Sequence, residues 1–252
     1  MKRVLITGGS EGIGFALAKC FARDGYEIVL NGRNEEKLNR AKEILEREYS
    51  VSVQLIPMDL SVKGSAEELY HKAVPLDVLV NNAGCGYAGR VWDGDPDAEE
   101  DMVVLNDVSL MTLSRLFLKD HARTHDGILL NTASTGAFQP GPYIASYYAS
   151  KSFVVSFTEA AAYEAKKYGV KVHCLCPGPV DTAFYEKSKG HHPRNAMSVS
   201  KCAEYAYRRM GRRKVILIPG ISDRLMKYLP AKLKMHAVGM LKRRYLSEEA
   251  DH

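Results

Sequence analysis

RVLITGGSEGIG, residues 3–14, joins a short apolar run to a glycine-rich turn. The run has the length of a buried strand, and a helical pattern at 14–23 follows it. Such a turn lets backbone N–H groups and the positive helix end approach a pyrophosphate. Its glycines, Gly8, Gly12 and Gly14, are spaced G-x-x-x-G-x-G rather than G-x-G-x-x-G. The turn predicts a nucleotide site, although alone it could also be an ordinary tight connection.

Seven short apolar runs alternate with longer amphipathic segments. This alternation is typical of βαβ units and predicts a parallel sheet. Most runs are nearly continuous in apolar residues, as in strands that are covered on both faces. The predicted strands are RVLIT (3–7), EIVLN (27–31), VQLIPM (53–58), DVLVNN (77–82), GILLNTAS (127–134), VKVHCLCPG (170–178) and KVILIPG (214–220). Helical segments are predicted at 14–23, 34–48, 98–120 and 149–168.

Length and composition favour one domain. The chain has 252 residues, 46% of them hydrophobic, which is enough for one well-buried core, so we expect a single domain over 1–252. Only three consecutive apolar residues precede the glycine turn, too few for a signal peptide, and a cytoplasmic protein is expected. Five cysteines without a C-x-x-C pair favour reduced core thiols over disulfides or a zinc site.

The net charge of +5 is unevenly distributed. From residue 201 onward there are 13 Lys and Arg against 5 Asp and Glu, a surplus of eight, so the first 200 residues carry −3. Because the part with the recognisable motifs is slightly acidic, no nucleic-acid partner is expected.

The end of the chain has a different pattern. Leu225, Leu229 and Leu233 recur at intervals of four with cations between them, and Pro230 divides the segment. We expect a basic helical extension over 221–252, packed on a core of 1–220 with its cations in solvent. Contact of this tail with anionic lipid or with a substrate phosphate is a less favoured alternative.

The second predicted strand ends in Asn31, Gly32 and Arg33. A carboxylate at this place suits the ribose 2′-OH of NAD, whereas a cation suits the 2′-phosphate of NADP. The planar Arg33 guanidinium matches phosphate geometry, although it could also simply begin a solvated helix. Glu11, in the glycine turn, argues weakly against a phosphate because of its charge.

Polar residues also follow three other predicted strands, where open α/β sheets bind ligands. They are Asp59-Leu60, the N-N-A-G motif at 81–84 and the N-T-A-S motif at 131–134. Ser134 could be a helix cap or a hydrogen-bond donor to a substrate carbonyl. It lacks the G-x-S-x-G context, so a hydrolase triad is poorly supported.

Three tyrosines stand in YIASYYASK, residues 143–151. Only Tyr147 has a lysine, Lys151, four residues later and thus on the same helix face, about 5–6 Å away at Cβ. A phenol has an ordinary pKa of about 10, so a fixed cation is needed to favour the phenolate near neutral pH. We expect Tyr143 to line the substrate pocket and Tyr148 to pack against the protein.

Together these motifs resemble the short-chain dehydrogenase/reductase superfamily, in its single-domain branch. The joint pattern is T-G-x-x-x-G-x-G, N-N-A-G, the interval of 13 residues from Ser134 to Y-x-x-x-K, and P-G-P-V-D-T at 177–182. The resemblance covers 1–220 and implies a Rossmann-like, doubly wound α/β sheet of seven parallel strands with helices on both faces. It also implies hydride transfer between a nicotinamide dinucleotide and a carbonyl or secondary alcohol.

The resemblance implies a catalytic tetrad of Asn106, Ser134, Tyr147 and Lys151. Tyr147 would exchange the proton, Ser134 would hold the substrate oxygen, Lys151 would grip the nicotinamide ribose, and Asn106 would anchor a proton-relaying water. Asp107 is an acid where the family more usually has an apolar residue.

The cofactor expected from Arg33 and the resemblance is NADP(H), with NAD(H) less favoured, and no metal is implied. The implied contacts are Gly8, Ser10, Gly12, Ile13 and Gly14 at the pyrophosphate, Arg33 at the 2′-phosphate, Asp59 and Leu60 at the adenine, Asn81, Ala83 and Gly84 at the adjoining ribose and nicotinamide, Val180 and Thr182 after Pro177 and Gly178 at the carboxamide and phosphate, and Tyr147 and Lys151.

The family forms its substrate lid after the P-G motif, here the short polar segment 183–198 with Phe184 at its root. The adjacent His191 and His192 lack a carboxylate companion, so a solvated loop is favoured over a metal pair. FQPGPYIASYYASK and the basic tail resemble a branch distantly related to 3-oxoacyl and hydroxysteroid reductases, which implies an apolar ketone or alcohol substrate.

Two alternatives to an NADP-dependent reductase stay open: a dinucleotide-sensing binding protein without turnover, and an NAD-dependent dehydrogenase of the same fold. The intact tetrad favours an enzyme. Relatives commonly form dimers or tetramers, so the resemblance implies a homodimer or homotetramer.

Overall fold

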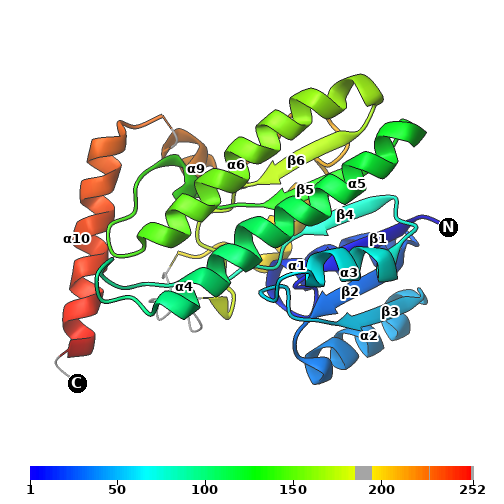
Figure 1. Ribbon diagram of the computed structural model, residues 1–252, viewed down its shortest axis with the longest axis horizontal. Coiled ribbons are helices and arrows are strands. Elements are labelled where there is room, and N and C mark those ends of the chain that lie inside the picture. The colour runs from blue at the N-terminus through cyan, green and yellow to red at the C-terminus, as the bar shows by residue number, and fades with distance from the viewer. Residues whose placement is uncertain (185–194, 227, 251–252) are drawn as a thin grey trace.

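The computed structural model describes residues 1–184, 195–226 and 228–250. Its centre is a seven-stranded sheet in the order β3-β2-β1-β4-β5-β6-β7, and every neighbouring pair is parallel (Figure 1). The predicted parallel α/β sheet is therefore confirmed. The strands are β1 (Arg3–Thr7), β2 (Glu27–Gly32), β3 (Val53–Pro57), β4 (Val78–Asn81), β5 (Ile128–Thr132), β6 (Lys171–Leu175) and β7 (Ile216–Leu217).

Helices cover both faces of the sheet because successive strand residues point to opposite sides and both sides are apolar. In β1, Val4 and Ile6 join one core cluster, whereas Leu5 joins the other. The first cluster includes residues of α1 (Gly12–Arg23), α2 (Glu35–Tyr49) and α8 (Val199–Tyr207). The second includes residues of α3 (Ser65–Ala73), α5 (Leu110–Thr124) and α6 (Ala145–Ala165).

The segment predicted as one helix over 98–120 is interrupted. It forms α4 (Pro96–Val103), a π-helical turn η1 (Val104–Ser109) and then α5. Single π turns inside α-helices occur frequently at functional sites, and this one carries Asn106. In addition, α6 begins four residues earlier than predicted, so Tyr147 lies in its first turn.

Short elements complete the described chain. The 3-10 helices are η2 (Thr135–Phe138) and η3 (Lys166–Tyr168). Past β7, the extension forms α9 (Ile221–Met226) and α10 (Ala231–Ala250), divided near Pro230 as predicted, and α10 stands at one end of the molecule (Figure 1). No helix in the described residues is long and apolar enough to cross a membrane.

All five cysteines are free, and four of them are buried. Cys174 and Cys176 in the β6 region are fully buried, as expected for core thiols. The order of the strands reverses on either side of β1, because β2 pairs on one side and β4 on the other. Open α/β sheets bind ligands at such a switch point, at the carboxyl ends of the strands.

Candidate active site

The glycine turn after β1 has a backbone that requires glycine. Gly8 and Gly12 have φ angles of +62° and +57°, in the left-handed region that other L-residues rarely adopt. A Cβ added at Gly14 would lie 2.2 Å from the Gly8 carbonyl oxygen, so Gly14 lets α1 begin directly against the turn. The side chain of Glu11, the residue before α1, caps none of the first N–H groups of the helix. This cradle therefore fits a pyrophosphate.

The N-N-A-G segment after β4 holds the glycine turn in place. Asn82 Nδ2 donates to the carbonyl oxygens of Thr7 and Gly8 at 3.2 and 3.3 Å. In return, Thr7 Oγ1 accepts hydrogen bonds from the backbone N–H groups of Asn82 and Ala83 at 2.9 and 3.0 Å. The two strand ends at the switch point are thus locked to each other.

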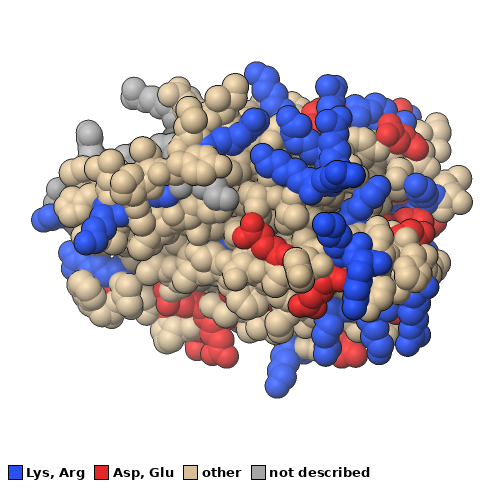
Figure 2. All heavy atoms as spheres, turned by 90° about the horizontal axis from the view of Figure 1, so that it is seen from above, with Lys and Arg blue, Asp and Glu red and all other residues tan. Residues whose placement is uncertain are grey.

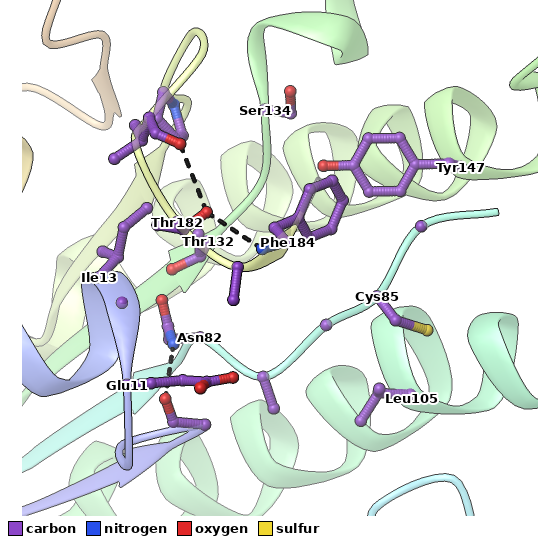
Figure 3. A pocket seen from close by; sticks show the side chains of 18 of the residues that line it. Glu11, Ile13, Asn82, Cys85, Leu105, Thr132, Ser134, Tyr147, Thr182 and Phe184 are labelled. Atoms are coloured by element: carbon purple, nitrogen blue, oxygen red, sulfur yellow. Dashed lines mark hydrogen bonds between the residues drawn. The ribbon is translucent and has the colours of Figure 1, made fainter. Parts of the chain in front are cut away.

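A cavity of about 550 Å³ opens at these strand ends and extends to α6 (Figure 3). Most of the predicted site residues line it: Gly8, Ser10, Gly12, Ile13, Arg33, Asp59, Leu60, Ala83, Gly84, Ser134, Tyr147, Lys151, Pro177, Gly178, Val180 and Thr182. Gly14, Asn81 and Asn106 lie behind its wall. Asn81, for example, is buried and donates to Asn131 Oδ1 at 2.9 Å and to Ser114 Oγ at 3.0 Å.

Lys151 is a buried cation next to Tyr147. Its ammonium lies 5.7 Å from the centroid of the Tyr147 ring and donates to the Thr132 carbonyl oxygen at 3.2 Å. Burial lowers the pKa of Lys151, and the Asp107 carboxylate opposes this shift. Figure 3 shows the Tyr147 hydroxyl directed into the cavity, where the phenol could exchange a proton with a bound ligand.

Ser134 is both a helix cap and a cavity residue. As the N-cap of η2, its Oγ accepts the Gly136 N–H at 3.1 Å. A hydroxyl that accepts one hydrogen bond keeps its own hydrogen for donation. The two interpretations of Ser134 are therefore compatible, because it can cap η2 and still donate into the cavity.

Asn106 joins the π turn to two other parts of the chain. Its amide accepts from Cys85 N at 3.0 Å, and donates to Cys85 O at 2.9 Å and to Ser150 Oγ at 3.1 Å. An added Cβ at Gly84 would come within 2.9 Å of Asn106 Oδ1 and 3.2 Å of Lys151 Nζ. Glycine at position 84 thus lets the β4 loop pass directly over both side chains.

Asp107, next along the π turn, is a buried carboxyl that is 8% exposed. Its Oδ1 has no hydrogen-bond partner among the described residues. Burial raises the pKa of Asp107 to about 7, and Lys151 opposes the rise. An ionisable pair whose members shift each other's pKa thus lies beside Tyr147.

The other end of the cavity is aromatic. Tyr147 packs with Phe184 and Tyr148, at ring-centroid distances of 5.4 and 6.1 Å. Tyr148 lines the cavity and also packs over Gly136, where an added Cβ would meet its ring at 3.0 Å. Tyr143 is not among the residues that line this cavity, and its expected place at the substrate stays a prediction. The expected lid is described only at 183–184 and 195–198, and His191 and His192 lie outside the described residues.

Two ion pairs lie at the end of the cavity next to β2. Arg33 pairs with Asp59 at 3.3 Å, and Lys37 pairs with Glu11 at 2.7 Å. Sequence reasoning missed Lys37, because its partner is 26 residues away and no local pattern connects them. It also missed Cys85, and it gave no individual role to Asn82 and Thr132, although both belong to motifs identified at strand ends.

A parallel sheet with a glycine-rich turn and a ligand-sized cavity at its switch point defines a dinucleotide-binding α/β protein. The sequence model of the short chain dehydrogenase family matches residues 2–192. An uncharacterized oxidoreductase of Thermotoga maritima is 30% identical over 190 residues, which is 74% of each chain.

Solved structures agree with this assignment. A short-chain dehydrogenase from Sphingobium yanoikuyae in complex with NADPH superposes with a TM-score of 0.84 at 24% identity, covering 98% of this chain and 96% of that one. An alcohol dehydrogenase from Thermococcus sibiricus complexed with 5-hydroxy-NADP is 29% identical with a TM-score of 0.76, covering 86% and 94%. The chain belongs to the short-chain dehydrogenase/reductase family. It is an oxidoreductase of that family, acting on CH–OH and C=O groups with a nicotinamide dinucleotide.

Proposed function

We propose that this protein is an NADP-dependent reductase of apolar ketones that also oxidises the corresponding secondary alcohols. The observation that carries the proposal is the pairing of Tyr147 with buried Lys151 in the same cavity as the glycine turn. When bound, the nicotinamide gives or takes the hydride. The chain has to bind the substrate oxygen and move a proton to or from it.

Tyr147 is the proposed proton donor to the substrate oxygen in the reductive direction. Donation leaves a phenolate, which the Lys151 cation next to the ring stabilises. Ser134, whose Oγ already accepts the Gly136 N–H, donates its hydrogen to the same oxygen and fixes its position. Asn106 does not line the cavity, and we propose that it positions other residues: its hydrogen bonds to Cys85 and Ser150 hold the π turn against α6.

The preference for NADP rests on the charges at the end of β2. Asn31, near the end of β2, is neutral and donates to the carbonyl oxygens of Ile56 and Met58, so this strand itself supplies no carboxylate for a ribose 2′-OH. Arg33 and Lys37 both line the cavity. From the sequence, the negative charge of Glu11 argues against a bound phosphate. The ion pair with Lys37 compensates that charge. The complex of the 29% identical Thermococcus sibiricus enzyme with 5-hydroxy-NADP supports the same choice.

The proposed substrate class follows from the wall around Tyr147. Ile144, Tyr148 and Phe184 line that end of the cavity, and buried Met102 packs against the same cluster. Such a wall favours an apolar ketone, with its oxygen at Tyr147 and Ser134 and its carbon skeleton against the aromatic rings.

The test combines a cofactor titration with a substrate panel. We expect NADPH to bind more tightly than NADH, and Arg33→Ser to weaken NADPH binding by about 10- to 100-fold with a smaller effect on NADH. Arg47→Ser is the matched control, because Arg47 is similarly exposed on α2 but does not line the cavity.

Steroid, 3-oxoacyl and small ketones should then be compared by NADPH consumption. Turnover that is fastest with the apolar ketones supports the proposal. Tighter binding of NADH would reverse the cofactor choice, and NADPH binding without turnover of any ketone would favour the dinucleotide-sensing alternative.

We also propose a homodimer or homotetramer. Val108, Met111 and Phe153 are large apolar side chains that are exposed on η1, α5 and α6. Their exposure supports an interface at these helices. Light scattering of the wild type and of Phe153→Glu should show an oligomer that the substitution weakens, and a wild-type monomer would contradict the proposal.

A further inference from the structure

The C-terminal extension has an outward apolar face that the proposed function does not use. Its large side chains are between 44% and 82% exposed, and we call them the C-terminal apolar face. Ile221 and Leu225 are one turn apart on α9, and Leu233 and Met240 share a side of α10 by their spacing. The full set is Ile221, Leu225, Tyr228, Leu229, Leu233 and Met240.

Another side of the extension packs on the protein. Lys234 of α10 is only 5% exposed, and its Nζ donates to the Phe138 carbonyl oxygen at 2.8 Å. A Cβ added at Gly239 would lie 3.5 Å from Pro142 Cγ, so α10 also approaches the loop before α6. On α9, the Asp223 carboxylate lies directly against Gly178. These contacts orient both helices.

The sequence-based expectation for this segment was therefore wrong in orientation. Leu225, Leu229 and Leu233 were expected to pack on the domain with cations in solvent, but all three are exposed, while Lys234 is buried. Several large exposed apolar side chains within 20 residues of the chain are unfavourable in water and are typical of an interaction surface.

The cations beside this face favour an anionic partner. Arg224 of α9 and Arg209 both lie over the Tyr205 ring, with guanidinium carbons 5.3 and 4.3 Å from its centroid. No carboxylate in the described part of the chain forms an ion pair with either of them. Over 221–246 the sequence has seven Lys and Arg against one acid, Asp223.

Figure 2 shows where charged side chains lie on one face of the molecule. At the end of the molecule that carries α10, on the left, a few Lys and Arg side chains lie among a broad uncharged surface. The other end has a denser group of cations. A second copy of the chain docked on the same face would bring like charges together, whereas an anionic lipid surface would match both the cations and the apolar side chains.

We propose that the C-terminal apolar face binds the surface of an anionic phospholipid membrane. Helices α9 and α10 lie in the membrane interface. Their apolar side chains reach the boundary between headgroups and acyl chains, and the cations lie at the lipid headgroups. The contact is peripheral, since no described helix could span the bilayer. The loop that α10 contacts at Phe138 and Pro142 leads into Ile144 and Tyr148 of the cavity wall, so the contact would place that wall near the lipid.

Vesicle co-sedimentation of the full chain tests this proposal. Wild type should bind phosphatidylcholine vesicles that contain phosphatidylglycerol, and binding should weaken with salt and be far weaker to phosphatidylcholine alone. Lys232→Glu should weaken binding by at least about fivefold, the effect expected for one interfacial cation. Lys63→Glu, an exposed lysine before α3, should not.

A second pair of variants tests whether apolar side chains insert into the membrane. Tyr228→Glu should abolish most of the binding, whereas Tyr163→Glu on α6, outside the C-terminal apolar face, should bind as wild type does. The two tyrosines are a matched pair because they are 82% and 84% exposed. Both substitutions are on the surface, and NADPH turnover and thermal unfolding confirm that each variant is folded. Those assays also separate failure of this proposal from failure of the reductase proposal.

Three results would overturn the proposal. Wild type could fail to sediment with anionic vesicles, or the Tyr228→Glu variant could bind as well as wild type, which would place the contact away from the C-terminal apolar face. Wild type could also form a dimer in light scattering that Tyr228→Glu dissociates, without any vesicle binding, which would assign the face to a second copy of the chain.

Discussion

Replacing Asp107 with asparagine should flatten the pH dependence of the free energy of unfolding between about pH 5 and about pH 8. Asp107 is buried, and its Oδ1 has no hydrogen-bond partner in the described residues. Burial raises the pKa of this carboxyl from 3.8 to about 7, with Lys151 opposing. The folded protein therefore binds a proton at Asp107 more tightly than the unfolded chain does.

The direction of the effect follows from this difference. A raised pKa in the folded state stabilises the protein fully below the unfolded value, and that stabilisation is lost as the pH rises through about 7. From pH 8 down to pH 5 the folded state gains the proton while the unfolded chain stays ionised at this residue. At 1.36 kcal/mol for each unit, Asp107 alone should add about 3 kcal/mol of stability over that interval.

Urea unfolding of wild type and Asp107→Asn at both pH values measures this contribution. The difference between the two pH values is taken within each protein, so any effect of asparagine that does not depend on pH cancels. The pH-dependent change should be about 3 kcal/mol larger in wild type than in the variant. Parallel changes in the two proteins would refute the burial and charge argument for Asp107.

Three further predictions concern the cavity. Gly14→Ala should lower the free energy of unfolding by about 1–3 kcal/mol in urea titrations, because the added Cβ overlaps the turn. Gly84→Ala should lower kcat in steady-state assays, because its Cβ would come within 3.2 Å of Lys151 Nζ; unchanged kcat would argue against this crowding. Glu11→Gln should tighten NADPH binding about two- to fivefold by releasing Lys37 from its ion pair, and weaker binding would contradict that role.

The fold was predictable where local signals determine it. The bounds of β1 agree with the sequence prediction because a continuous apolar run ends at a Thr-Gly-Gly turn. The interrupted helix around Asn106 was not predictable, since a π turn changes the backbone hydrogen bonding without a distinct side-chain pattern. The orientation of α10 depends on tertiary contacts such as Lys234 with Phe138, which the leucine spacing does not contain.

The candidate site was predictable to a similar degree. Tyr147 and Lys151 were identified because helical spacing places them on one face. The wall contributed by Tyr148 and the ion pair of Lys37 with Glu11 depend on how distant segments fold together. Helical spacing is a local property of the sequence, whereas contacts between distant segments are not.

The most direct test of the proposed mechanism compares two adjacent tyrosines of α6. Tyr147 and Tyr148 both line the cavity, but only Tyr147 has the Lys151 ammonium over its ring. Tyr147→Phe should reduce turnover of an apolar ketone with NADPH by about 10²–10⁴-fold while NADPH still binds. Tyr148→Phe should stay within about tenfold of wild type. Full activity in Tyr147→Phe, or equal losses in the two variants, would contradict the assignment of Tyr147 as the proton donor.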